Sequence, residues 1–246
     1  IAHSPAAGRA LLAPLAAEHP LDAPPSPPSL AWLQRTISME QWRLGCGAAA
    51  RLTADERMDL VRKYNALYTH HAPLSADLDS RERGHADTLS LLGAQLLMGK
   101  PTADWFASSG RGVHAWPVRS LLGATLTLRR ALDASPHNFQ VALALLSCYL
   151  ALGAPVAAAE IHRALHIKYI QFDTLVYLLL PALDELGASS LAASAIAEVR
   201  RFHERGLSEL PDNLALAIKS GSYPQALEFA ALKASLESSW LRALVE

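Results

Sequence analysis

Apolar residues recur at steps of three and four positions along most of the chain from Leu30 onward, which is the spacing of one apolar helix face. One helix is predicted to begin at Thr53, where Asp55 and Glu56 follow a residue that caps helices well. Further helices, separated by short turns, are predicted over about residues 86–98, 118–134, 139–152, 156–166, 172–186, 189–204, 211–220 and 224–236. No stretch alternates apolar and polar residues between hairpin signals, so an all-α fold is predicted.

A glycine stands between two helical patterns at three places, and neighbouring glycines are 34 residues apart. An alanine follows five residues after each of them, as expected where two helices press together after a tight turn. These residues are Gly153, Gly187 and Gly221, followed by Ala158, Ala192 and Ala226. Because 34 residues is the period of tetratricopeptide repeats, the spacing predicts a helical-hairpin solenoid.

The repeat region is predicted to span residues 30–246. Its repeats are degenerate, because the positions twelve residues after the three glycines, where the consensus has a small residue, hold Leu165, Val199 and Lys233. Residues 1–29 are predicted to form an alanine- and proline-rich segment and linker, and the glycines and prolines within 99–117 indicate a loop. The prolines at 20–28 leave one alternative open, which is a ligand for an aromatic groove.

Composition adds limits to this picture. With 51% hydrophobic and 18% charged residues among 246, the chain has ample apolar material for a continuous core. A net charge of −1 without a strong basic block does not favour broad attraction to nucleic-acid phosphates or anionic lipid. Cys46 and Cys148 lie far apart, which argues against a disulfide framework and for a reducing compartment. The uncharged run 141–159 has the length of a membrane span, but the turn expected at Gly153 divides it into two buried helices.

The chain begins with Ile1 and shows no signal-peptide pattern, so we expect an excerpt of a longer protein. No residue pattern predicts a catalytic, cofactor or metal site, and no Ser-His-Asp or Cys-His arrangement stands out. Metal-ligating side chains do gather at His70, His71, His85 and Asp87. Adjacent histidines on a helix point about 100° apart, however, and no zinc-site spacing is present. The glycine-flanked tripeptides at 45–47 and 110–112 follow no strand and lack a phosphate-loop signature.

Two polar strings, 135–140 and 166–174, each lead into a predicted helix. One interpretation is capping, in which Asn138 or Asp173 accepts hydrogen bonds from the first free N–H groups of its helix. Phe139 or Phe172 would then close the core. The other interpretation is a partner or peptide contact at the inner edge of the solenoid. The candidate residues for this contact are His137, Gln140, Lys168 and Gln171.

Both strings resemble sequences of the auxiliary, non-catalytic subunit of the NatB N-terminal acetyltransferase complex. The similar parts are Pro136-His137-Asn138-Phe139-Gln140, Tyr149 to Gly153, and Ile167-Lys168-Tyr169-Ile170-Gln171-Phe172-Asp173-Thr174-Leu175. Weaker similarity occurs at 52–68 and 84–97, and the similar parts together cover somewhat more than half of the chain. The stretch 20–28 and the loop at 99–117 depart from the family pattern.

The resemblance implies a cytoplasmic, ribosome-associated helical scaffold that holds a small catalytic subunit of the GNAT acetyltransferase fold. That partner uses acetyl-CoA to acetylate nascent chains beginning Met-Asp, Met-Glu, Met-Asn or Met-Gln. The auxiliary subunit carries no acetyl-CoA motif, so this chain is expected to be non-catalytic and to bind no cofactor, DNA or membrane. The alternative function is that of a generic tetratricopeptide-like protein–protein adaptor. An α-helical enzyme with an unrecognised site is a third hypothesis, which turnover of acetyl-CoA without a second polypeptide would favour.

Overall fold

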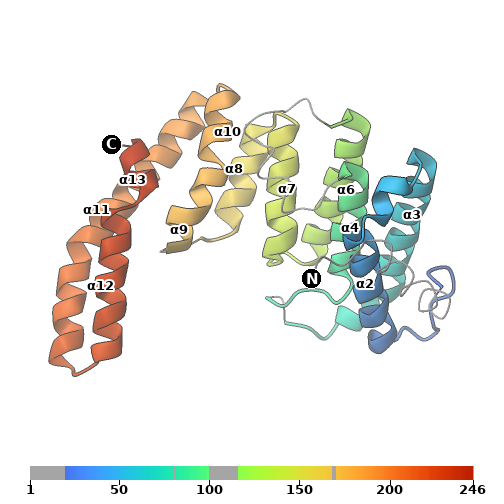
Figure 1. The fold of residues 1–246 in the computed structure, drawn as a ribbon, viewed down its shortest axis with the longest axis horizontal. Coiled ribbons are helices and arrows are strands. Elements are labelled where there is room, and N and C mark those ends of the chain that lie inside the picture. Colours follow the sequence, from blue (N-terminus) through green and yellow to red (C-terminus); the bar gives the residue numbers. More distant parts are fainter. Residues whose placement is uncertain (1–19, 80, 100–115, 168–169, 246) are drawn as a thin grey trace. The chain divides into compact units, whose positions relative to one another are not determined.

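The computed structural model describes residues 20–79, 81–99, 116–167 and 170–245, and within these ranges every regular element is a helix (Figure 1). This confirms the predicted all-α class. The chain divides into two units, Ile1–Ala154 and Pro155–Glu246, which are described one at a time. Residues 1–19 and most of the loop expected at 99–117 lie outside the described ranges.

In the first unit, α4 lies among the other helices and packs against α3 and α6, while α2 and α7 also contact it (Figure 1). The helices of this unit are α2 (Leu30–Gly45), η1 (Ala48–Arg51), α3 (Ala54–His71), η2 (Ala72–Ser75), α4 (Asp87–Met98), α6 (Val118–Ala134) and α7 (Phe139–Ala151). The core that joins α2, α3 and α4 is built from Leu33, Ile37, Leu60, Val61, Tyr64, Leu67, Ala86, Leu89, Leu92 and Leu96.

The start of α3 confirms the helix predicted at Thr53. Thr53 Oγ1 accepts a hydrogen bond from the backbone N–H of Glu56, and the Glu56 carboxylate accepts one from the backbone N–H of Thr53. This reciprocal pair satisfies two of the free N–H groups at the helix end. The hydrogen bonds favour the ionised carboxylate, so they lower the pKa of Glu56.

The proline-rich residues 20–29 form no helix and lie against α3. Leu21 packs on the core cluster, Asp22 pairs with Lys63 at 2.8 Å, and the carbonyl oxygen of Pro25 lies 3.0 Å from Nε2 of His70. The described part of this stretch is therefore anchored to the helical core at three points.

The three glycines that define the repeat share one backbone conformation. Gly153, Gly187 and Gly221 have φ values of 70°, 66° and 74°, a left-handed conformation that only glycine adopts without strain. At each turn the residue after the glycine donates its N–H to a carbonyl oxygen five residues earlier, at 2.9 Å, so each helix ends in the same motif. Ala158, Ala192 and Ala226 are all buried. The turns predicted from the 34-residue spacing, and the burial of the three alanines, are thus confirmed.

The helices of the second unit are α8 (Pro155–Ala164), α9 (Ile170–Leu175), η3 (Val176–Leu178), α10 (Leu180–Glu185), α11 (Ser189–Lys219), α12 (Tyr223–Glu237) and α13 (Trp240–Val245). The single helix predicted over 172–186 is wrong, because the chain forms α9, η3 and α10 there. Pro181 explains the interruption, since it lacks an N–H and its ring would clash with the carbonyl of Tyr177 in a continuous helix.

The break predicted between 204 and 211 is also wrong, because α11 continues through Pro211. Its hairpin with α12 is extensive, and α13 contacts α11 as well (Figure 1). Packing on both partners offsets the one backbone hydrogen bond that Pro211 cannot make. Gly206, which lies in this stretch, allows a close approach of the two helices, because a Cβ there would lie 2.9 Å from Cδ1 of Leu236.

Candidate functional site

The first turn of α7 is held by a buried polar network. Asn138 Oδ1 accepts hydrogen bonds from the backbone N–H groups of Gln140 and Val141, at 3.2 and 3.3 Å, so the capping predicted for Asn138 is confirmed. Its Nδ2 donates to Oδ2 of Asp87 at 2.7 Å, and the same carboxylate oxygen accepts from the N–H of Gly84 at 3.0 Å. The network therefore ties the start of α7 to the loop before α4 and fixes the residues that follow Asn138.

Phe139 does not close the core as expected, because 52% of it is exposed. It shares a helix face with Leu143, which lies four residues later and lines an open groove rather than the core. The Arg83 guanidinium lies 5.6 Å from the centre of the Phe139 ring, within the range of a cation–π contact. Nη1 of Arg83 also donates to Oε1 of Gln140 at 3.1 Å. Arg83, Phe139 and Gln140 thus form one surface cluster at the start of α7.

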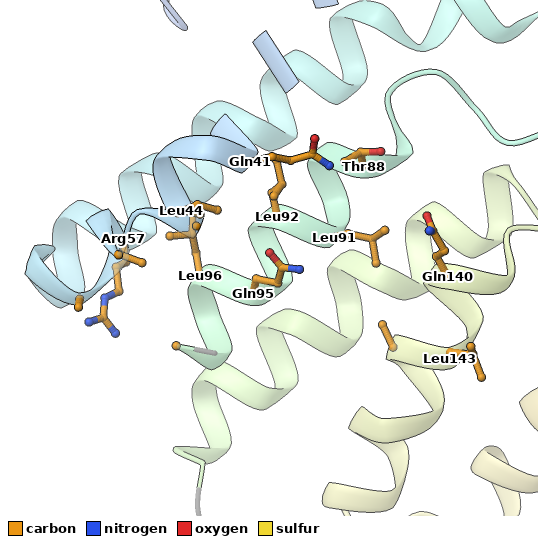
Figure 2. Close-up of a pocket in the computed structure, with 16 residues that line it drawn as sticks. Gln41, Leu44, Arg57, Thr88, Leu91, Leu92, Gln95, Leu96, Gln140 and Leu143 are labelled. Atoms are coloured by element: carbon orange, nitrogen blue, oxygen red, sulfur yellow. The ribbon is translucent and has the colours of Figure 1, made fainter. Parts of the chain in front are cut away.

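Gln140 lines a groove of about 790 Å³ in the first unit (Figure 2). Its walls come from α2, η1, α4 and α7, with Arg57 contributed by α3. The apolar lining includes Leu44, Leu91, Leu92, Leu96 and Leu143, and the polar lining is Gln41, Thr88, Gln95, Gln140 and Arg57. Among the described residues that line it, none is an aspartate or a glutamate.

Arg57 is the charged residue of this lining. Within the described ranges it makes no ion pair, and its Nε is buried without a hydrogen-bond partner. A buried, unpaired guanidinium nitrogen is costly unless an acceptor reaches it. The groove therefore offers apolar contacts, side-chain amides and one cation to a ligand.

The four residues expected to contact a partner are not brought together. His137 is exposed in the turn between α6 and α7 and does not line the groove, whereas Gln140 does. Lys168 lies outside the described residues. Gln171 is exposed on α9 of the second unit, and it does not line the cavity of about 290 Å³ found there.

Asp173 does not precede a helix as expected, because α9 begins at Ile170 and includes position 173. Sequence reasoning also missed Gln41, Gln95, Arg57 and Arg83. The sequence offered one weak signal. Gln95 is a single polar residue within the leucine-rich stretch 89–98, where a helix buried on all sides would have an apolar residue.

A second groove, of about 1110 Å³, lies over α3, α4 and α6. Exposed apolar side chains contribute to it, among them Met58, Leu122 and Leu126. None of the four residues expected to contact a partner belongs to its lining.

The histidines considered for a metal have structural surroundings. His71 is buried, stacks on Trp32 at a centroid distance of 5.4 Å, and has its Nδ1 2.8 Å from the carbonyl oxygen of Leu67. Burial lowers its pKa. Within the described ranges no group of three or more histidine, cysteine, aspartate or glutamate side chains could hold a metal ion. Across the same ranges, no helix combines the length and apolar character needed to cross a membrane.

Comparison with known proteins bears on the chain as a whole. A family model described as the non-catalytic subunit of the N-acetyltransferase B complex, NatB, matches residues 8–246. The NatB auxiliary subunit of Rattus norvegicus, N-alpha-acetyltransferase 25, is 25% identical over 213 residues, which are 87% of this chain and 21% of the relative. Subunit arm1 of the N-terminal acetyltransferase B complex of Schizosaccharomyces pombe is 30% identical over 191 residues, which are 76% and 23% of the two chains.

The phagocyte signaling-impaired protein of Aedes aegypti is also similar, with 26% identity over 217 residues, 87% of this chain and 22% of the relative. The chain thus spans about a fifth of the length of these curated relatives. The family model, by contrast, matches far more than half of the chain, including the hairpin turns and the groove. The chain belongs to the family of non-catalytic NatB subunits.

Proposed function

We propose that this chain is a scaffold that binds the catalytic, GNAT-fold subunit of NatB and supports acetylation of nascent chains beginning Met-Asp, Met-Glu, Met-Asn or Met-Gln. The observation that carries the proposal is the family match over residues 8–246. The helical hairpins and the groove between α2, α4 and α7 support it, because such stacks commonly present binding surfaces. The proposed role places the chain in the cytoplasm, at the ribosome.

A scaffold of this kind contributes to acetyl transfer without touching the acetyl group. It holds the catalytic subunit in one arrangement and keeps it close to emerging chains, which raises the effective concentration of substrate. Gln140 is the best supported of the four expected contact residues, because it lines the groove and pairs with Arg83. Phe139 joins this proposal as an exposed aromatic residue held beneath an arginine, a type of residue that often anchors interfaces.

The test is co-expression of the full chain with the catalytic NatB subunit of the same organism. We expect the two to copurify, and we expect acetyl transfer to a peptide beginning Met-Asp to require the catalytic subunit. The double variant Phe139→Ala, Gln140→Ala should weaken copurification, whereas Gln34→Ala, at an exposed position of α2 outside the groove, should not.

Three outcomes would count against this function. Acetyl transfer by the chain alone would indicate an enzyme. Failure of the wild-type chain to bind the catalytic subunit, together with binding of unrelated proteins, would favour the generic adaptor. Normal assembly by the double variant, combined with loss of acetyl transfer to a saturating peptide, would assign these residues a direct role in the reaction.

A further inference from the structure

The groove carries one glutamine from each of the three helices that form its main walls. Gln41 belongs to α2, Gln95 to α4 and Gln140 to α7, and Figure 2 shows them on these separate helices. A side-chain amide offers an N–H donor and a carbonyl acceptor, the same pair of groups that a peptide bond offers. Leu91 of α4 and Leu143 of α7 supply apolar surface in the same groove.

The hydrogen-bonding capacity of two of these amides is not used up within the described ranges. Gln41 is exposed and makes no hydrogen bond there, and Gln140 uses only Oε1, which accepts from Arg83. The NH₂ group of Gln140 is therefore available to an acceptor. A ligand whose backbone groups are free could bond to both amides.

The charge of the groove selects further among ligands. Its described lining contains no carboxylate, and Arg57 brings a guanidinium whose Nε is buried without a partner. Arg83, at the Gln140 end, adds a second positive charge. A carboxylate on the ligand would pair with the positive charge of the Arg57 guanidinium, which has no ion-pair partner within the described ranges, and it would meet no acidic side chain among the described lining residues.

We propose that this groove binds an extended, non-helical segment of the catalytic subunit, with its peptide groups on the amides of Gln41 and Gln140 and an Asp or Glu side chain on Arg57. An extended segment fits better than a helix, because a helix satisfies its own backbone N–H and C=O groups and has none left for glutamine amides. This inference rests on the proposed function, since it takes the catalytic subunit as the partner.

Site-specific photo-cross-linking tests the proposal. The photoreactive residue p-benzoylphenylalanine is placed singly at positions 41, 95 and 140, and at exposed position 34 of α2 as the control, in the full chain bound to the catalytic subunit. We expect the three groove positions to cross-link to one continuous segment of the partner, in sequence order along it, while position 34 gives no product with that segment. Cross-links scattered over several segments, or repeating at three- and four-residue steps as on a helix, would overturn the proposal.

Charge reversal at Arg57 is the second test of the proposal. Arg57→Glu should weaken binding of the catalytic subunit about tenfold or more, whereas Arg35→Glu, at an exposed position of α2 outside the groove, should leave it unchanged. Replacing the cross-linked acidic residue of the partner with arginine should restore binding to Arg57→Glu. If Arg57→Glu does not fold, as judged by circular dichroism, Arg57→Gln takes its place, and undiminished binding by a folded variant refutes the carboxylate contact.

The two proposals fail in different ways. If wild-type chain and catalytic subunit form no complex, the proposed function itself is wrong. If they form a complex in which the groove positions give no cross-link and Arg57→Glu has no effect, the scaffold function stands and the groove inference is wrong.

Discussion

The side-chain amide nitrogen of Asn138 lies 2.7 Å from Oδ2 of Asp87, and both side chains are almost completely buried. Asn138 therefore has two tasks. Its oxygen caps α7, and its nitrogen satisfies a buried carboxylate that belongs to the first turn of α4. Asn138 and Asp87 are 51 residues apart in the sequence, so a single amide group links the starts of α7 and α4.

Substitution of Asn138 should separate these two tasks. Asn138→Ala removes both and should lower the free energy of unfolding of the first unit by about 2 to 4 kcal/mol. Asn138→Asp keeps the capping oxygen but places a second carboxylate against Asp87, so it should also destabilise. Urea unfolding followed by circular dichroism measures both, with Gln34→Ala as a surface control. An Asn138→Asp protein as stable as wild type would show that capping alone accounts for the residue.

The alanines that follow the repeat glycines should not tolerate large side chains. Ala158 is 0% exposed and Ala192 is 8% exposed, so a leucine at either position must displace its neighbours. Ala158→Leu and Ala192→Leu should each cost about 1 to 3 kcal/mol. Thermal melts test this against Ala193→Leu, one residue further on and exposed. Equal melting temperatures for the buried and exposed variants would contradict the packing argument.

Backbone conformation alone should decide the effect of replacing Gly187. No atom lies within 4 Å of a Cβ built there, but φ is +66°. Gly187→Ala should therefore destabilise the second unit by about 1 to 2 kcal/mol. Gly45→Ala is the matched control, because its surroundings are equally open and its φ is not positive. It should stabilise slightly, by about 0.4 to 1 kcal/mol, so the two substitutions should shift the urea midpoint in opposite directions.

Acid should weaken the second unit through His162. This side chain is buried, and burial lowers its pKa, while nearby Glu198 acts in the opposite direction with a smaller effect. Since the unfolded chain takes up the proton first, the free energy of unfolding should fall as pH drops below about 6.5, until the lower pKa of the folded state is passed. Urea unfolding at about pH 7.5 and about pH 5.5 measures the difference. His162→Gln should reduce it, and an unchanged difference in that variant would assign the acid sensitivity elsewhere.

Much of the fold could be predicted from spacing, because a turn that needs positive φ leaves a glycine in the sequence. Three turns could be located from the positions of their glycines, Gly153, Gly187 and Gly221. Gly206 and Pro211 carry the same kind of signal, yet Gly206 serves a close contact with Leu236 and Pro211 lies within α11. Only the packing of α11 on α12 and α13 distinguishes these uses, and that packing has no local signature.

The groove could be predicted only in part for a similar reason. Gln140 could be found because it follows a residue that caps a helix. Gln41 and Gln95 are single polar positions on their own helices, 54 residues apart in sequence, and they become neighbours of one groove only when α2 and α4 pack together. Arg57 belongs to a third helix, so its role depends on tertiary structure entirely.

The uninterrupted course of α11 makes the second unit sensitive to insertions in a way that its turns are not. A residue added at the turn near Gly187 would lengthen the connection between α10 and α11 without changing the register inside either helix. A residue added between Arg200 and Gly206 would rotate everything beyond it by about 100° and advance it by about 1.5 Å. The guanidinium of Arg200 bonds to the carbonyl oxygen of Val245 in α13, which follows α12 and returns to the first half of α11. The contact between Val245 and Arg200 would then be lost. We therefore expect homologues to vary in length at the hairpin turns and to keep the length of this stretch of α11 constant.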